Sequence, residues 1–318
     1  MTMSQDEALA HSEPRRPRAT AGTTVVHALQ GMLMGTADVI PGVSGGTVAL
    51  ILGIYERLIG TIHDVAASIF ALVRGDRGRA REYWRRADFA LVLPLLAGIA
   101  VALGVGSVVL PPLIETYPVI MSALFFGLIA GALPVPWRRI SALGGKHYAL
   151  ALVGALVAFG MTGFTPRDIA DPALPLVFGA AAIAICAMIL PGVSGAYLLL
   201  IMGMYEVTLH AVRDLNVLYV AVFGAGAATG LGLFSKLLSW LLDHRHDATM
   251  AVLVGLMAGS LRKLWPWQSD AGALHAPAGA GELLLALGCV AAGIVIVIGL
   301  TRFGEHSLAG RRETVARH

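Results

Sequence analysis

The sequence predicts an all-α polytopic membrane protein built from two repeats of inverted topology. Hydrophobic residues make up 57% of the 318 positions and charged residues only 14%, with a mean hydropathy of +0.75. Soluble domains carry far more charge. The segment Pro-Gly-Val-Ser-Gly occurs twice, at 41–45 and at 191–195. Basic residues gather in a few short loops, so the pI near 9.0 does not indicate nucleic-acid binding.

The duplication extends beyond these two motifs. Segments 50–56 and 200–206 share Leu-Ile, a glycine and Tyr-Glu at the same places, and segments 127–133 and 255–261 are also alike. The latter pair carries small residues four apart, which favours close helix contacts. A helix-breaking motif between apolar stretches, once in each half, is typical of transporters with internal repeats. Such breaks are tolerated at membrane depth only where protein buries them or where they line a cavity.

The length of the apolar segments predicts how each motif sits in the membrane. These segments lie at about 24–40, 47–62, 88–110, 117–134, 147–164, 174–190, 196–210, 217–242, 249–264 and 282–302. A helix needs roughly 20 residues, with a range of about 17 to 25, to cross the hydrocarbon core. The segments on either side of each motif are at or below that limit. We therefore expect a re-entrant hairpin at each motif, with both arms entering from the same side.

Loop charge predicts the orientation. The loop at 63–87 carries six arginines, Arg74, Arg77, Arg79, Arg81, Arg85 and Arg86. The positive-inside rule makes this loop cytoplasmic, and a hairpin that returns to its own side also keeps the basic amino tail there. The basic loop at 138–146 is then cytoplasmic, and the loop at 165–173 faces outside. Three crossings separate the two hairpins, so they enter from opposite faces and the repeats are inverted.

The expected organisation follows from these segments. Residues 1–23 are polar and lack the apolar core and cleavage site of a signal peptide, so they are expected to form a cytoplasmic tail. Counting the crossings places the carboxyl tail, with Arg311, Arg312 and Arg317, on the same side. Each repeat is a re-entrant helical hairpin plus three transmembrane helices. The parts are a disordered cytoplasmic tail (1–23), repeat 1 (24–146, with hairpin 24–62, Arg-rich cytoplasmic loop 63–87, two helices and a basic loop), a helix completing repeat 1 together with repeat 2 (147–302, with hairpin 174–210), and a cytoplasmic tail (303–318).

The repeated motif is suited to binding phosphate. A helix that begins after each break has backbone N–H groups without intrahelical partners and a partial positive charge at its first turn. Two such ends entering from opposite faces can meet and hold one anion between them. The alternative is that the two serines only cap their helices while the prolines permit the bend. The candidate phosphate-binding residues are Ser44, Gly45, Gly46, Thr47, Ser194 and Gly195.

Three acids are candidates for coupling or gating. Asp38 precedes the first motif by three residues, which places it deep in the membrane. An acid there is a functional candidate through a proton, a cation or a basic partner, or it accepts hydrogen bonds from the broken helix. Glu56 and Glu206 are expected about nine residues, or roughly 14 Å, beyond the start of their helices, toward opposite surfaces. They are gate residues, proton carriers or acids that end helices at an interface.

Three basic residues are auxiliary candidates. Lys236 lies within an apolar helix and needs a partner, such as a substrate phosphate. Arg262 and Lys263 precede Trp265-Pro266-Trp267, and they either draw in a phosphate from the outer surface or serve as anchors beside an aromatic belt. The histidines have no spacing that suggests a metal site, and no cofactor is expected.

Several blocks resemble the bacterial and archaeal polyprenyl-phosphate transporter family. They are residues 35–47 with 53–56, residues 191–195 with 205–206, and residues 259–266, so the resemblance covers nearly the whole membrane part. It implies a flippase that returns undecaprenyl phosphate, or a related polyprenyl phosphate, from the outer to the inner leaflet of the bacterial cytoplasmic membrane. This lipid carries precursors of the cell wall, including peptidoglycan. Composition and spacing alone indicate only an inverted-repeat transporter with an anion site.

The sequence leaves two alternative functions. A secondary transporter of a small soluble anion would have a closed, water-filled vestibule in place of a lateral opening. A membrane lipid phosphatase would need a nucleophile with clustered acid–base or cationic partners, and no histidine lies beside the motif serines in the sequence. No catalytic residue is assigned, and the protein is not expected to be an enzyme. Its expected partners are a polyprenyl-phosphate lipid and membrane lipids, without nucleic acid, and self-association into a homo-oligomer is compatible with the sequence.

Overall fold

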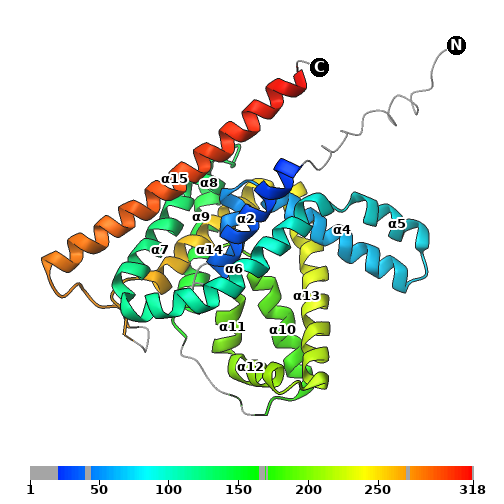
Figure 1. The fold of residues 1–318 in the computed structure, drawn as a ribbon, viewed down its shortest axis with the longest axis horizontal. Helices are drawn as coiled ribbons and strands as arrows, with labels where there is room; N and C mark the ends of the chain where they lie inside the picture. Colours follow the sequence, from blue (N-terminus) through cyan, green and yellow to red (C-terminus); the bar gives the residue numbers. More distant parts are fainter. Residues whose placement is uncertain (1–20, 40–43, 165–168, 170, 270–272, 317–318) are drawn as a thin grey trace.

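The structure, a computed structural model, describes residues 21–39, 44–164, 169, 171–269 and 273–316, with side chains as far as residue 302. The tail predicted at 1–23 lies outside this part as far as residue 20. The described residues form helices and one isolated β-bridge between Gln268 and Leu274. The helices (Figure 1) are α2 (Ala21–Val39), α3 (Gly45–Ile51), α4 (Tyr55–Val73), α5 (Arg77–Arg86), α6 (Phe89–Thr116), α7 (Pro118–Ala132), α8 (Pro134–Trp137), α9 (Gly145–Met161), α10 (Leu174–Ile189), α11 (Gly195–Ile201), α12 (Tyr205–Arg213), α13 (Val217–His244), α14 (His246–Ser260), the 3-10 helix η1 (Leu261–Leu264) and α15 (Ala280–Ala316).

Several helices are long and apolar enough to cross a membrane. Within the described residues these are α6, the run Pro118–Trp137 that joins α7 and α8, α13, and the part of α15 at Ala280–Arg302. The pair α11 and α12, bent by 106°, adds a fifth if it is counted as one span. Helices α9 and α10 are apolar but shorter, at 17 and 16 residues. The chain is therefore an all-α, polytopic membrane protein.

Four pairs of packed helices make up most of the bundle. Helix α2 packs on α6, α10 on α13, α7 on α15, and α9 on α14. Glycines bring the backbones of each pair together. A side-chain carbon at Gly31 of α2 would lie 2.0 Å from the Leu95 carbonyl oxygen of α6. Because that approach is far shorter than any van der Waals contact, a larger residue there requires the backbones to separate.

The duplicated stretches 127–133 and 255–261 serve as helix contacts in both halves. A side-chain carbon at Gly127 of α7 would lie 2.2 Å from a carbonyl oxygen of α15, and one at Gly255 of α14 would lie 2.1 Å from a carbonyl oxygen of α9. One turn further along, a side-chain carbon at Gly259 would lie 2.2 Å from another carbonyl oxygen of α9, and one at Gly131 would lie 3.0 Å from a backbone carbon of α15. The prediction that these small residues allow close helix contacts is confirmed.

Both short helices that follow the sequence motifs end in the same turn. Gly53 follows α3 and Gly203 follows α11, with φ of 71° and 72°. The Gly53 N–H donates to the Leu50 carbonyl at 3.1 Å, and the next N–H reaches the Ala49 carbonyl at 3.0 Å. The second half repeats both bonds, at 3.1 and 2.8 Å. These two bonds form a Schellman motif, in which the residue just after the helix has a positive φ. Glycine is favoured there because it adopts a positive φ without strain.

This turn corrects the predicted second arm of each hairpin. The arms expected as single helices at 47–62 and 196–210 are each broken, into α3 and α4 in the first half and α11 and α12 in the second. Glu56 and Glu206 therefore lie in the first turn of a new helix, α4 or α12. The expectation that they lie about 14 Å along the helix that follows the motif is wrong, because that helix ends before it reaches them.

The predicted Arg-rich loop at 63–87 is also largely helical. Helix α4 continues to Val73, and α5 returns alongside it after a turn at Gly75. The Asp76 carboxylate caps α5 by accepting from the Arg79 N–H at 3.0 Å, and the Ser68 hydroxyl donates to the Ala80 carbonyl at 2.8 Å. Arginine is a good helix former, so a cap and a short turn are enough to make this segment helical. Figure 1 shows the two helices projecting from the bundle.

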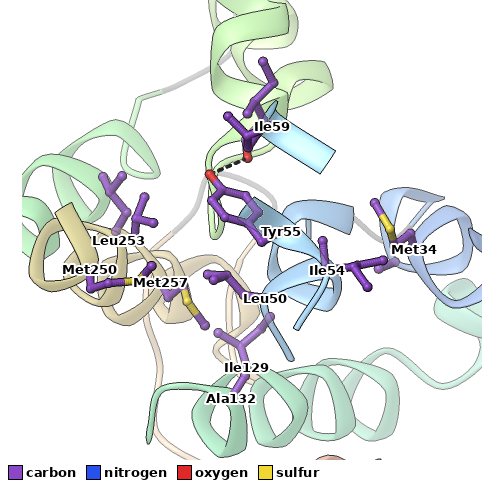
Figure 2. Close-up of a cluster of buried hydrophobic side chains, with 14 of the residues drawn as sticks. Met34, Leu50, Ile54, Tyr55, Ile59, Ile129, Ala132, Met250, Leu253 and Met257 are labelled. Atoms are coloured by element: carbon purple, nitrogen blue, oxygen red, sulfur yellow. Dashed lines mark hydrogen bonds between the residues drawn. The ribbon is translucent and has the colours of Figure 1, made fainter. Parts of the chain in front are cut away.

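Helix α3 lies in the main hydrophobic core. Leu50 of α3 is fully buried, and Figure 2 shows it among Ile129 of α7, Met257 of α14 and Tyr55 at the start of α4. Helix α11, its counterpart, buries only Gly195 and one leucine. Helix α3 is therefore enclosed by protein, and α11 is more open.

The turn at Gly53 provides a test of the corrected arm. A methyl group there meets only the end of the Arg139 side chain, at 3.6 Å, so Gly53→Ala introduces strain through its positive φ alone. We expect a loss of about 1–2 kcal/mol of stability. The unfolding temperature of the purified protein in detergent measures it. Gly60→Ala is the matched control, because Gly60 lies inside α4 with open space around it and alanine stabilises a helix interior. An equal loss in both variants would contradict the assignment.

Candidate functional site

Both motif serines cap the helix that follows them. Ser44 precedes α3 with an extended backbone, and its hydroxyl accepts from the Gly46 N–H at 3.2 Å. Ser194 precedes α11 in the same way and accepts from the Tyr197 N–H at 3.3 Å. Capping satisfies N–H groups that a new helix leaves free. The capping role that the sequence analysis kept as an alternative is thus present at both serines. Residues 41–43 of the first motif lie outside the described residues.

The two helix breaks lie against each other, although they are far apart in the sequence. The Gly192 N–H donates to the Thr47 hydroxyl at 3.0 Å, and the Tyr55 hydroxyl donates to the Ile189 carbonyl at 3.3 Å, a bond drawn in Figure 2. The Ser44 hydroxyl lies 3.4 Å from the carbonyl oxygens of residues 188 and 190. Side chains of Ser44, of α3 and of the start of α4 therefore lie within hydrogen-bond distance of backbone groups of the second break. Ser44 and Thr47 are buried in this contact.

Asp38 caps the same helix as Ser44. Its Oδ1 accepts from the Gly45 N–H at 2.7 Å. A side-chain carbon at Gly45 would lie 2.6 Å from the Asp38 Oδ2, so glycine is needed for this approach. Side chains of the protein thus occupy the N–H groups of both glycines after the first break. The Gly45 N–H donates to Asp38, and the Gly46 N–H donates to Ser44. Gly46 also packs on the Ile189 carbonyl oxygen.

The second break borders a small cavity. It is lined by the end of α9, the segment 192–194, the first turn of α11, and the junction of α14 with η1. Its polar side chains include Ser194, Ser260 and Lys263. The cavity volume is about 20 Å³, which is enough for one water molecule. A phosphate group, with four oxygens around phosphorus, needs more room.

Lys263 is the free cation of this cavity. Its Nζ lies over the Tyr197 ring, 5.1 Å from the centroid. The Tyr197 hydroxyl donates to the Thr162 carbonyl at 3.2 Å, which fixes the ring beneath the ammonium group. Among the residues that the structure describes, no carboxylate forms an ion pair with Lys263. A half-buried ammonium group without a counter-ion beside a serine hydroxyl provides a positive site for an anion.

The other two basic candidates lie elsewhere. The Arg262 Nη1 donates to the Phe159 carbonyl at 3.0 Å, and its guanidinium stacks on the Phe159 ring at 4.5 Å. These contacts tie η1 to the end of α9. Lys236 lies on an exposed face of α13 and does not line the cavity. Of the three predicted basic residues, only Lys263 shares the cavity with a motif serine. Gly195, behind the same serine, packs on the Ala184 carbonyl oxygen.

Glu56 belongs to a polar cluster at the other end of α3. Its Oε1 lies 3.4 Å from the Arg139 Nη1 and 3.5 Å from the His246 Nε2. The Arg139 Nη2 also donates to the Leu50 carbonyl at 3.3 Å, near the end of α3. Glu206, the counterpart of Glu56, is exposed and forms no ion pair with any residue that the structure describes. The two halves therefore differ at this position.

Sequence reasoning did not single out Arg139 or His246 as site residues. In the sequence Arg139 is one of several charges in the loop at 138–146, and His246 is the first residue of α14, ahead of its apolar run. The one available signal was the pair of adjacent arginines after the apolar segment that ends near residue 134. Their contact with Glu56 depends on how α3, α8 and α14 pack, which local sequence does not specify.

Comparison with known proteins places these features in a family. Residues 34–280 match the family model described as undecaprenyl phosphate translocase-like. A polyprenyl-phosphate transporter of Vibrio cholerae serotype O1 is 38% identical over 240 residues, covering 76% of this chain and 77% of the relative. A polyprenyl-phosphate transporter of Staphylococcus aureus is 29% identical over 258 residues, covering 76% of this chain and 86% of the relative. No solved structure gives a significant match.

The matched region contains both helix breaks, the cavity beside Ser194, and the cluster around Glu56. It extends from the last turns of α2 to the first residue of α15. Both breaks and most of the helices that pack around them therefore lie within the region that matches the family. The resemblance that the motifs indicate is confirmed. The chain belongs to the undecaprenyl phosphate translocase-like family of membrane proteins.

Proposed function

We propose that this protein is a flippase that moves undecaprenyl phosphate, or a related polyprenyl phosphate, from the outer to the inner leaflet. The observation that carries the proposal is the shared cavity of Ser194 and Lys263 at the second helix break. The names of the two relatives supply the class of lipid. Return of this lipid to the inner leaflet would recycle the carrier used in cell-envelope synthesis, peptidoglycan included.

The head group would bind between the two helix breaks. The Lys263 ammonium supplies a full positive charge, and Ser194 supplies a hydroxyl at the positive end of α11. Ser44 and Thr47 would offer their hydroxyls from the facing break once the breaks separate. The polyprenyl tail would stay in the lipid beside the bundle. Because the cavity holds only about one water molecule, the structure corresponds to a state that is closed to the head group.

Inverted repeats would provide the alternating access. Helix pairing supports them: α2 on α6 corresponds to α10 on α13, and α7 on α15 corresponds to α14 on α9. In the pair α7 and α15, and again in the pair α14 and α9, one helix comes from each half of the chain. Two interlocked repeats require this exchange. Positive charge in the α4–α5 segment and at 138–146 supports cytoplasmic termini and a location in the cytoplasmic membrane.

The topology can be tested by labelling single cysteines from one side of the membrane. In a background with Cys186 and Cys289 replaced by alanine, Gly78→Cys in α5 should react only from the cytoplasm. Asp171→Cys, in the segment just before the second hairpin (174–210), should react only from outside. Membrane-impermeant maleimide applied to intact cells and to inverted vesicles measures this. Reaction of both positions from the same side would remove the basis for inverted hairpins.

The cavity can be tested by binding. Lys263→Gln and Ser194→Ala should each weaken binding of undecaprenyl phosphate about ten- to a hundredfold, because each removes a hydrogen bond to a charged group, roughly 1.5–3 kcal/mol. Ser44→Ala should have an effect of similar size if the first break also binds the head group. Titration of the detergent-solubilised protein with the lipid measures these affinities, with unfolding temperature as the check on folding.

Two comparisons make that result specific. Lys236→Gln removes the same charge from an exposed face of α13 and should leave binding unchanged. Undecaprenol, which lacks the phosphate, should bind the parent protein and Lys263→Gln equally weakly. If inorganic phosphate competes as well as the lipid does, the protein is a carrier of a small soluble anion. Release of phosphate from the lipid by the parent protein would instead point to a phosphatase.

Asp38 and Glu56 are proposed to couple or gate transport. Asp38 holds the first turn of α3 through its bond to Gly45, so a proton on this carboxylate would loosen the first break. Asp38→Asn retains an oxygen acceptor but cannot take up a proton. We expect it to fold like the parent and to shift or flatten the pH profile of lipid transport in proteoliposomes. A profile that matches the parent at every pH would leave Asp38 with its capping role only. Glu56 would act at the inner end, through Arg139.

A further inference from the structure

Helices α4 and α5 form an arm that exposes large apolar side chains outside the bundle. We use the term arm for residues 62–86. Val73 at its end is 81% exposed, and Phe70 and Trp84 are 57% and 52% exposed. Ile69 and Leu72 are exposed to a similar degree. Exposed apolar side chains are expected on a membrane-spanning helix such as α6, because they face lipid. The arm, in contrast, belongs to a strongly charged segment. Its exposed apolar surface therefore needs a separate explanation.

The six arginines of the arm fall into two sets of three. Arg79 pairs with Asp76, Arg86 pairs with Glu82, and the Arg74 guanidinium stacks 4.2 Å above the Phe70 ring. Arg77, Arg81 and Arg85 are exposed and form no ion pair with any carboxylate that the structure describes. Residues four apart on a helix lie on one face, so these three form a continuous stripe along α5.

Trp84 lies next to this stripe. It follows Arg81 by three residues, so its side chain projects from a neighbouring face of the same helix. Its ring also contacts the ring of Phe89, with centroids 4.6 Å apart. Phe89 is the first residue of α6, and only Ala87 and Asp88 separate α5 from it. The end of α5 is therefore fixed beside the first residue of α6, a helix long and apolar enough to cross a membrane.

We propose that the arm is an interfacial membrane anchor that binds anionic phospholipid head groups. Arg77, Arg81 and Arg85 contact lipid phosphates, while Trp84 and the apolar end of α4 enter the boundary between head groups and acyl chains. A helical element with a basic stripe beside aromatic and aliphatic side chains is suited to that boundary. Tryptophan prefers the same depth, and each arginine near an anionic surface strengthens binding about fivefold.

The bilayer is favoured over an acidic protein as the partner by position and chemistry together. The arm is joined directly to α6, so the leaflet that α6 enters is always within reach. An acidic protein surface would complement the arginines but would leave Val73, Phe70 and Trp84 in water. Anionic lipid satisfies both groups of side chains at once. This inference does not depend on which substrate the helix breaks carry.

The test uses the full chain in lipid nanodiscs, where both faces of the bilayer are accessible. Cys186 and Cys289 are replaced by alanine, and Val73→Cys carries an environment-sensitive fluorophore at the end of the arm. Emission and quenching by iodide are compared in phosphatidylcholine alone and in an equal mixture with phosphatidylglycerol. We expect a blue shift and protection from iodide in the mixture, both reduced by high salt because screening weakens the arginine–phosphate attraction.

Two triple variants of the arm are matched in charge. Arg77→Gln/Arg81→Gln/Arg85→Gln removes the stripe and should weaken docking on the anionic mixture on the order of a hundredfold, so that the protection is lost. Arg74→Gln/Arg79→Gln/Arg86→Gln removes the other three arginines of the same arm and should retain most of it. Equal protection in neutral and anionic bilayers would overturn the proposal. So would equal loss in the two triple variants, which would reflect net charge alone.

Discussion

Backbone groups freed at a helix break inside a bilayer have no water to bind, and the rest of this structure depends on how the two breaks meet that constraint. Side chains of the first half satisfy backbone groups of the second break. The Gly192 N–H binds the Thr47 hydroxyl, and the Ile189 carbonyl binds the Tyr55 hydroxyl. The packed helix pairs hold the two breaks at this contact. Glycine at their interfaces permits backbone approaches that any larger residue would prevent.

The constraint is met differently at the two breaks. At the first break, Asp38 and Ser44 occupy the N–H groups of Gly45 and Gly46, and the surrounding core buries the result. At the second break only Ser194 caps the helix, and a cavity with Lys263 lies beside it. In one half the repeated motif thus has its helix-end N–H groups occupied by side chains, and in the other half it borders a cavity.

Local chemistry explains which parts of the fold and site could be predicted from the sequence. Helix breaks, serine caps and small-residue contacts depend on neighbouring residues, so the duplicated motif revealed them. The turn at Gly53 had a local signal too, since glycine ends helices and the charged residues Glu56 and Arg57 follow it closely. The meeting of Lys263 with Ser194 and of Arg139 with Glu56 depends on tertiary packing, which no local pattern encodes.

The bonds between the breaks also limit how a head group can enter. A cavity of about 20 Å³ cannot admit a phosphate unless the breaks separate, and separation exposes the Gly192 N–H and the Thr47 and Ser44 hydroxyls. Leaving such groups unpaired inside a membrane costs about 1–3 kcal/mol each. A phosphate can accept hydrogen bonds from all three, so the ligand can replace the contact that it breaks. In the function we propose, this exchange lets the head group open its own site, whereas a lipid without phosphate would leave the breaks closed.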